Sequence, residues 1–302
     1  MELIRSGTRF DFIGKKKFTI WVSAIALLIS LGSVFLHGLK YGVDFAGGIL
    51  IQIRVSQAVD ISEVRNAMEA MGSKDAMVQK FGGENEFLIR VEKSAEDLEG
   101  MSKKIQTFLQ ERFKDKTLEI RRVEVVGPKV GKDLKTKALW AVGLSFAAIL
   151  VFVAWRFKQV SYGLGGIAAL VHDIIVTYGA ISIAGLEYSL PLMAVILTII
   201  GFSINDTIVI FDRVRENIKK MRKESLETVF NVSINETLGR TILTSGTVMM
   251  VVLILFFFGG PVIHDFALTL IVGLISGTYS TIYVASPVVL LWNKHFTRKK
   301  KR

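Results

Sequence analysis

The sequence predicts a polytopic α-helical membrane protein: six transmembrane helices, with an α+β ferredoxin-like domain between the first and the second. The 302 residues are 51% hydrophobic with a mean hydropathy of +0.45, which is too apolar for ordinary soluble domains. Six runs reach the roughly 20 apolar residues that a helix needs to cross a bilayer core about 30 Å thick. The stretch between the first two runs has instead a soluble composition.

The six apolar runs are the candidate membrane spans. The first follows Lys15, Lys16 and Lys17 and is longer than the roughly 7 to 15 apolar residues of a cleaved secretory signal, so we interpret it as an uncleaved span. The runs cover residues 18–37, 138–156, 162–184, 190–212, 240–259 and 265–292. We expect the last five, within 138–292, to form one bundle. Residues 1–17 precede the first span, and a basic tail, 293–302, follows the last.

The distribution of charge predicts the orientation. Residues 38–137 carry 18 basic and 16 acidic side chains, whereas the other 20 basic residues all fall on the side of the two termini. Because short cytoplasmic loops are enriched in Lys and Arg, we expect both termini to be cytoplasmic and residues 38–137 to lie on the opposite side. The net charge of +11 is thus explained by topology rather than by nucleic-acid binding. The absence of Cys excludes disulfides, thiolate metal sites and a Cys nucleophile.

The soluble segment alternates strands and helices. Period-two patterns predict strands at 49–55, 76–81, 86–91 and 118–126, with hairpin chemistry at residues 82–85. Helical patterns cover 60–71, where Asp60 or Ser62 could cap the helix, and 95–113. The order β-α-β-β-α-β is that of the ferredoxin-like fold. The segment has no His and no nucleophile beside a base, which favours a binding or mechanical module over an enzyme.

A glycine-rich segment, residues 42–48, stands where the chain leaves the first span. It includes Asp44, Phe45, Gly47 and Gly48. Considered alone, it predicts a turn, because Gly adopts backbone angles that other residues resist. It lacks the spacing of a phosphate-binding loop.

Ionisable residues inside the predicted spans are candidate functional residues, since a charge at bilayer depth is costly. Asp173, beside His172, lies in the third span; Asp206 lies in the fourth, and Arg240 opens the fifth. Counting about 1.5 Å per residue, Asp206 and Arg240 both lie within roughly 8 Å of the cytoplasmic edge and could pair. Relative movement of such a pair would load or release a proton. The alternatives are a static polar pair, a snorkelling Arg240 and, for Asp173, a hydrogen bond to a neighbouring helix.

Two further patterns indicate architecture. Gly273 and Gly277 form a small-residue face that predicts close helix packing in the last span. Apolar residues at helical spacing amid Lys and Arg predict a separate amphipathic helix, residues 213–231, lying on the cytoplasmic membrane surface.

Several motifs resemble the SecF branch of the SecD/SecF family. They are Val43-Asp44-Phe45-x-Gly47-Gly48, Leu170-x-His172-Asp173, the long fourth-span motif from Ile199 to Asn217, and Arg240-Thr241-x-x-Thr244-Ser245. The resemblance covers nearly the whole chain. It implies half of a resistance-nodulation-division transporter, in the bacterial inner membrane, with residues 38–137 in the periplasm.

The resemblance also implies function and partners. The family uses the proton-motive force to promote protein translocation, with SecD as the other half, near the SecYEG channel and YajC, after SecA has acted, and with unfolded exported polypeptide as cargo. Asp206 and Arg240 match its proton-pathway residues, with Asn205 and Thr207 beside them and Asp173 as a further candidate, while Asp44, Phe45, Gly47 and Gly48 match its periplasmic base motif. The expected coupling ion is H⁺, with Na⁺ as the alternative.

Two other functions stay open from the sequence: a proton-driven small-molecule exporter of the same superfamily, and a passive scaffold of the translocase. Exporters of that superfamily usually carry twelve spans and two large outside domains, twice what this chain has. No Gly-x-x-x-x-Gly-Lys-Ser/Thr sequence occurs, so we expect no ATP site and no enzyme. No metal or other cofactor is expected, since the four His form no metal-ligand spacing.

Overall fold

The computed structural model describes residues 10–73, 76–80, 85–91, 98–157 and 159–300. The chain forms two compact units. One contains residues up to Leu39, Val142–Leu186 and the residues from Pro191 onward; the other contains Lys40–Ala141 and Glu187–Leu190. The predicted hairpin turn at 82–85 and the start of the predicted helix 95–113 lie largely outside the described residues.

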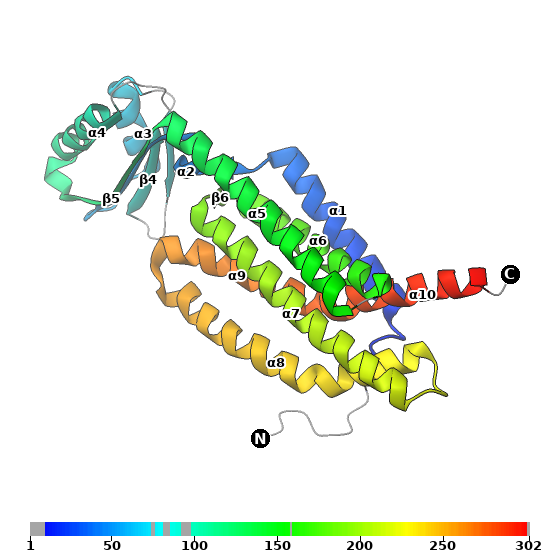
Figure 1. The fold of residues 1–302 in the computed structure, drawn as a ribbon. Helices are drawn as coiled ribbons and strands as arrows, with labels where there is room; N and C mark the ends of the chain where they lie inside the picture. Colours follow the sequence, from blue (N-terminus) through cyan, green and yellow to red (C-terminus); the bar gives the residue numbers. More distant parts are fainter. Residues whose placement is uncertain (1–9, 74–75, 81–84, 92–97, 158, 301–302) are drawn as a thin grey trace. The chain divides into compact units, whose positions relative to one another are not determined.

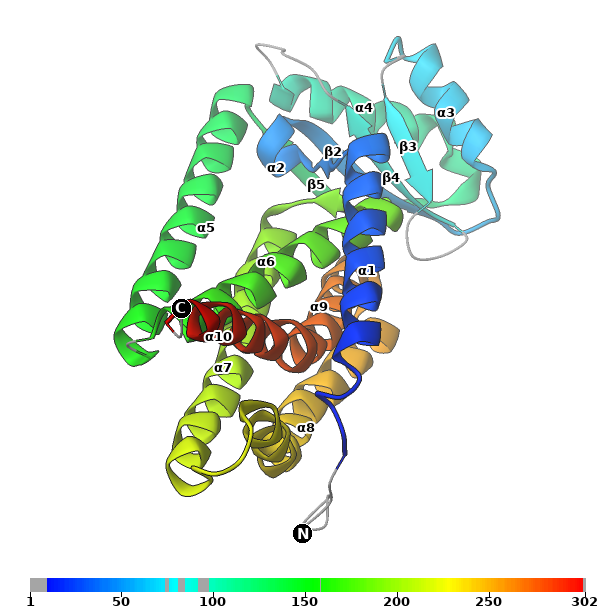
Figure 2. The ribbon, with the colours of Figure 1, turned by 90° about the vertical axis from the view of Figure 1, so that its right-hand side faces the viewer.

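Six helical segments within the described residues are long and apolar enough to cross a membrane, as the fold class predicted. The last one comprises α9 and α10, which follow one another in Figure 2, and a π-helical turn joins the two. The helices are α1 (Lys16–His37), α5 (Pro128–Phe157), α6 (Val160–Ile183), α7 (Leu190–Lys220), α8 (Leu226–Phe258), α9 (Gly260–Ser280) and α10 (Ser286–Lys300), with the π turn at Thr281–Ala285.

Three helices extend well past the predicted spans, and the separate amphipathic helix at 213–231 was a wrong prediction. Helix α5 begins ten residues early, α7 runs to Lys220, and α8 begins at Leu226 after a turn in which the Ser225 hydroxyl accepts a hydrogen bond from the Thr228 N–H at 3.1 Å. The apolar periodicity exists, but it serves helix packing: Val214 and Phe230 are fully buried, and Phe230 meets Phe211 edge to face. Periodicity alone does not distinguish a lipid surface from a neighbouring helix.

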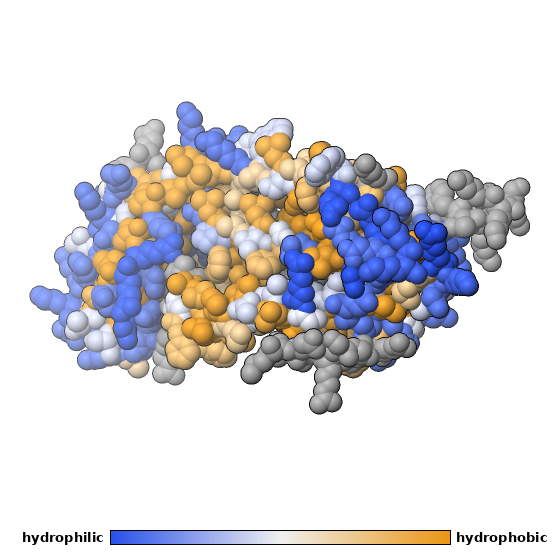
Figure 3. All heavy atoms as spheres, turned by 60° about the horizontal axis from the view of Figure 1, so that its bottom comes forward, coloured by the Kyte–Doolittle hydropathy of each residue, from blue (hydrophilic) through white to orange (hydrophobic). Residues whose placement is uncertain are grey.

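The surface of the helical segments is strongly apolar. Figure 3 shows hydrophobic side chains over much of one face of the molecule. Large apolar residues that a soluble protein would bury are highly exposed, including Phe35 at 90% and Phe258 at 84%. A continuous apolar surface of this kind suits a lipid or protein environment within a membrane.

The soluble domain is a four-stranded antiparallel sheet covered on one face by α3 and α4 (Figure 1). The strand order β3-β4-β2-β5, with one helix between β2 and β3 and another between β4 and β5, is ferredoxin-like, as predicted. The core is lined by Ile49, Ile51 and Ile53 of the central strand. The elements are β2 (Gly48–Val55), α3 (Ile61–Ala70), β3 (Met77–Lys80), β4 (Glu86–Val91), α4 (Leu98–Arg112), a 3₁₀ turn (Lys114–Lys116) and β5 (Leu118–Val126).

Helix α3 is capped by Asp60, one of the two candidates from the sequence. The Asp60 carboxylate accepts a hydrogen bond from the Ser62 N–H at 2.8 Å. Hydrogen bonding to the Ser62 side chain and backbone lowers the pKa of Asp60 below its usual value. The cap therefore holds its charge at neutral pH.

Candidate functional site in the membrane-spanning helices

Asp173 of α6 is buried at the meeting point of three helices, with only 1% of its surface exposed. Its Oδ2 accepts hydrogen bonds from the Ser203 hydroxyl of α7 at 2.6 Å and from the Ser280 hydroxyl of α9 at 2.7 Å. Its Oδ1 accepts one from the Ser276 hydroxyl of α9 at 2.6 Å. The carboxylate thus satisfies its acceptor capacity within the protein and ties α6, α7 and α9 together.

His172 completes the surroundings of Asp173. Its Nδ1 lies 3.1 Å from Asp173 Oδ1, and the ring is buried. The other ring nitrogen, Nε2, is buried without a hydrogen-bond partner among the described residues. The imidazole is therefore held from one nitrogen only, beside the ring of Tyr279 at 6.0 Å.

Asp206 of α7 is also buried, with 7% exposed, but its carboxylate is far less satisfied. It accepts one long hydrogen bond, from the Ser245 hydroxyl of α8 at 3.5 Å. Thr278 of α9 donates in turn to the Ser245 hydroxyl at 3.3 Å. A chain of polar groups therefore runs from α7 through α8 to α9, with a carboxylate at its end.

Thr207, beside Asp206, faces α9 rather than α8. Its hydroxyl lies 3.0 Å from that of Thr281, the first residue of the π turn. Thr281 donates to the Gly277 carbonyl at 2.9 Å. Single π-helical turns occur frequently at functional sites, because they redirect a helix and free backbone groups.

Two glycines bring α9 close to α7, as the small-residue pattern predicted for this helix. A Cβ atom added at Gly273 would overlap Ile199, and one at Gly277 would lie 3.2 Å from the Ser203 Cβ. Since Ser276 and Ser280 share this helix, the close approach places their hydroxyls within reach of Asp173.

Arg240 and Asn205 are exposed, but Arg240 lies close enough to Asp206 for its positive charge to act on that carboxylate. Arg240 lies within α8, fourteen residues after its start, because the helix begins at the Ser225 cap, before the start of the predicted span. Its side chain is exposed and forms no ion pair with Asp206, and Ser245, five residues further on, occupies the position beside that carboxylate. Asn205 is also exposed. Of the residues predicted for a proton pathway, the structure buries Asp206, Thr207 and Asp173 and leaves Asn205 and Arg240 on the surface.

Most of the hydrogen-bond partners are residues to which the sequence analysis assigned no role. Ser203 and Ser245 stand within the quoted motifs, whereas Ser276, Thr278, Ser280 and Thr281 were missed. Ser276 and Ser280 have the four-residue spacing of one helix face, and with Thr278 and Thr281 they make the last span rich in hydroxyls. This signal was visible beside Gly273 and Gly277, but hydroxyls alone do not reveal which carboxylate they serve.

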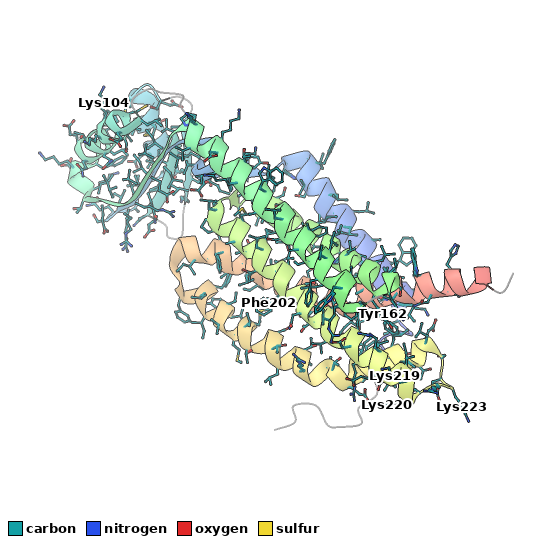
Figure 4. The ribbon with its side chains drawn as sticks, in the orientation of Figure 1. Lys104, Tyr162, Phe202, Lys219, Lys220 and Lys223 are labelled. Atoms are coloured by element: carbon teal, nitrogen blue, oxygen red, sulfur yellow. The ribbon has the colours of Figure 1, made fainter. Side chains whose placement is uncertain are left out.

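The α7–α8 turn carries a separate cluster of exposed charges. Figure 4 labels Lys219, Lys220 and Lys223 there, at the end of α7 and in the turn that follows. Earlier in α7, Arg213 pairs with Glu236 of α8 at 2.7 Å, and Asn217 donates to the same carboxylate at 2.6 Å. Asp212 pairs with Arg156 of α5. These contacts hold the helix ends together.

Six candidate spans, a soluble α+β domain and carboxylates buried between helices define a multi-pass membrane protein of transport type. Residues 105–295 match the family described as "Protein export membrane protein SecD/SecF, C-terminal", and residues 32–59 match the "SecD/SecF GG Motif". The chain belongs to the SecD/SecF family.

Curated relatives in this family are similar over almost their full length. The chain is 42% identical to a protein named "Protein translocase subunit SecF" from Desulfurispirillum indicum, over 94% of this chain and 92% of the relative. A protein of the same name from Thermodesulfovibrio yellowstonii is 43% identical, over 99% of this chain and 100% of the relative.

Two solved structures share the fold. The crystal structure of SecDF from Thermus, described as a translocon-associated membrane protein, matches 95% of this chain with a TM-score of 0.86 and 35% identity. SecDF in a super-membrane-facing form matches with a TM-score of 0.71 and 34% identity. The chain spans 39% and 41% of those two longer chains, so it corresponds to part of each.

Proposed function

We propose that the chain is the SecF-type subunit of a protein-export complex, in which the proton-motive force promotes translocation across the cytoplasmic membrane. The observation that carries this proposal is Asp206: a buried carboxylate between membrane-spanning helices, with one hydrogen bond of 3.5 Å. An ionisable group inside the membrane is a candidate functional site by default, and proton relays are among the roles that such groups serve.

The contrast with Asp173 supports the choice of Asp206 as the proton carrier. Protonating Asp173 would weaken three hydrogen bonds of 2.6–2.7 Å from serines on two other helices. Protonating Asp206 would weaken only the long hydrogen bond from Ser245. We therefore assign Asp173 a structural role and Asp206 the cycling one.

The coupling ion that suits this site is H⁺. A proton needs a single acceptor atom, whereas a hard cation needs several oxygen ligands. The described surroundings of Asp206 contribute one hydroxyl, that of Ser245. At about 2.3 kcal/mol per charge per 100 mV, one proton crossing a membrane held near 150 mV releases roughly 3.5 kcal/mol, enough to bias two conformations of similar energy.

The proposed complex contains SecD as the other half, because the SecDF chains are about two and a half times longer than this one. The exposed Asn205 and Arg240 are then available to that half. The proposed placement is the bacterial inner membrane, with the basic turn holding Lys219, Lys220 and Lys223 in the cytoplasm and the ferredoxin-like domain in the periplasm. SecYEG, YajC and, indirectly, SecA are the further proposed partners, and the cargo is an unfolded exported polypeptide.

The experiment is an Asp206→Asn substitution in cells that depend on this chain. We expect the SecD-type partner to co-purify at the normal level while arrival of secreted proteins in the periplasm slows. Normal export by the variant would refute the proposal. Reduced co-purification, with export falling only in proportion, would indicate a scaffold instead.

A further inference from the structure

The start of α7 is held by the glycine-rich segment that precedes the sheet of the soluble domain. Lys40 and Tyr41 (β1) pair in parallel with Glu187 and Tyr188 (β6), which immediately precede α7 in the chain. The Gly42 N–H donates to the Tyr188 carbonyl at 2.9 Å. Segments nearly 150 residues apart in sequence therefore form one small structure.

Asp44 lies in the four-residue helix α2 (Val43–Ala46) and binds the first turn of α7. Its Oδ2 accepts a hydrogen bond from the N–H of Leu190, the first residue of that helix, at 3.0 Å. The first four N–H groups of a helix lack partners within the helix, and its N-terminus carries a partial positive charge. Pro191 has no N–H, so the Asp44 carboxylate serves the donor at the very end of α7.

Packing leaves α2 little freedom. The Phe45 ring stacks on Tyr188 at 5.5 Å, and Tyr41 meets both rings edge on. Gly47 has a φ of +77°, and a Cβ there would lie 3.0 Å from the Pro128 Cα at the start of α5. A Cβ at Gly131 would lie 3.0 Å from the Gly47 nitrogen. The two glycines allow backbones to touch where side chains would separate them.

Asp44 is continuous in sequence with the soluble domain, and Leu190 is the first residue of the helix that carries Asp206. Strand β2, at the centre of the sheet, begins at Gly48, four residues after Asp44. Asp206 lies sixteen residues beyond Leu190 on the uninterrupted helix α7, a distance of about 24 Å along its axis. A rigid helix transmits an axial or rotational displacement from one position to the other.

We infer that Asp44 is a positioning residue for the transport reaction: its bond to the Leu190 N–H couples the base of the soluble domain to α7 and so to Asp206. The effect of this bond on export rests on the proposed function. The hydrogen bond between Asp44 and Leu190 is tested independently of that function. In this inference Asp44 acts through α7.

The first test is hydrogen exchange on the assembled complex, read on peptides that cover residues 187–196. With Asp44→Ala we expect the Leu190 amide to exchange roughly tenfold faster, the factor for losing one charge-assisted hydrogen bond. Asp44→Asn keeps an acceptor oxygen and should restore most of the protection. The control is Asp133→Ala, which removes an exposed carboxylate of α5 that pairs only with Lys137 among the described residues. Unchanged exchange in Asp44→Ala would overturn the inference.

The second test measures protein export by the same variants with and without a proton gradient. Asp44→Ala should lose the gradient-dependent part and keep the gradient-independent part, and Asp44→Asn should recover it. A purely structural defect would reduce both parts alike, or leave Asp44→Asn as defective as Asp44→Ala despite normal protection; either result overturns the inference. If Asp206→Asn exports normally, the proposed function fails, but the exchange result on Asp44 stands.

Discussion

Ser203 of α7 donates a hydrogen bond to Asp173 of α6 at 2.6 Å, and with Ser276 and Ser280 it encloses that carboxylate in hydroxyl groups from two other helices. Such hydrogen bonds favour helix association inside a membrane. Apolar side chains contribute less there, because they are about as favourably placed against lipid as against another helix. The Asp173 cluster is thus the polar centre that fixes α6, α7 and α9 against one another.

Replacing Asp173 by Ala should destabilise the protein. The change leaves three buried serine hydroxyls without their acceptor, at a cost of about 1–3 kcal/mol. Ser203→Ala removes one donor only and should cost about 0.6 kcal/mol. Thermal unfolding in detergent, followed by intrinsic fluorescence, measures both. Equal stability of Asp173→Ala and the unsubstituted protein would show that the cluster contributes nothing to helix association.

Gly179 of α6 lies against α1, and a larger residue there should force the two helices apart. An added Cβ would lie 2.5 Å from the Ser30 Cα, whereas one added at Gly163 of the same helix meets nothing within 4 Å. We expect Gly179→Ala to lower stability by about 1–3 kcal/mol through overpacking. Gly163→Ala should leave it unchanged or raise it by up to about 1 kcal/mol through helix propensity. The two variants unfolding at the same temperature would contradict this packing.

The cap of α3 predicts how the soluble domain responds to acid. Hydrogen bonds to Ser62 lower the pKa of Asp60, so the stabilisation is fully present above its ordinary value of 3.8 and is lost as the pH falls through the lowered pKa. Hydrogen exchange of α3 should therefore show no change in this cap between pH 8 and pH 5, and Asp60→Ala should weaken protection of the first turn across that range. If the protection that Asp60 gives to the first turn of α3 were already lost near pH 6, the charged cap described here would be wrong.

The fold was largely predictable because its two environments leave different patterns. Apolar runs identified the six helical segments within the described residues that are long and apolar enough to cross a membrane. Alternation identified the strands at 49–55 and 118–126 within one residue of their observed ends. The ends of the helices were harder to predict from the sequence. The helix from Leu190 continues eight residues past its predicted end at 212, on charged residues that pair with neighbouring helices, such as Arg213 with Glu236.

The site was only partly predictable, because depth along a span does not determine which neighbour a side chain meets. Counting residues predicted that Asp206 and Arg240 lie near one another, and the charge of Arg240 does act on Asp206, but the hydrogen-bond donor to that carboxylate is Ser245. One interpretation of Asp173 was a static hydrogen bond to a hydroxyl on a neighbouring helix. The structure has three such bonds. Their identity depends on the close approach of α9 at Gly273 and Gly277, which is a property of the folded bundle.

The central claim is that proton binding at Asp206 drives export. The most direct measurement is translocation of a secreted protein into inverted membrane vesicles, with and without an imposed proton gradient. Asp206→Asn is compared there with Asp212→Asn, a change on the same helix at the exposed pair with Arg156. We predict that the gradient accelerates export with Asp212→Asn and has no effect with Asp206→Asn. Equal acceleration of the two variants would contradict the account.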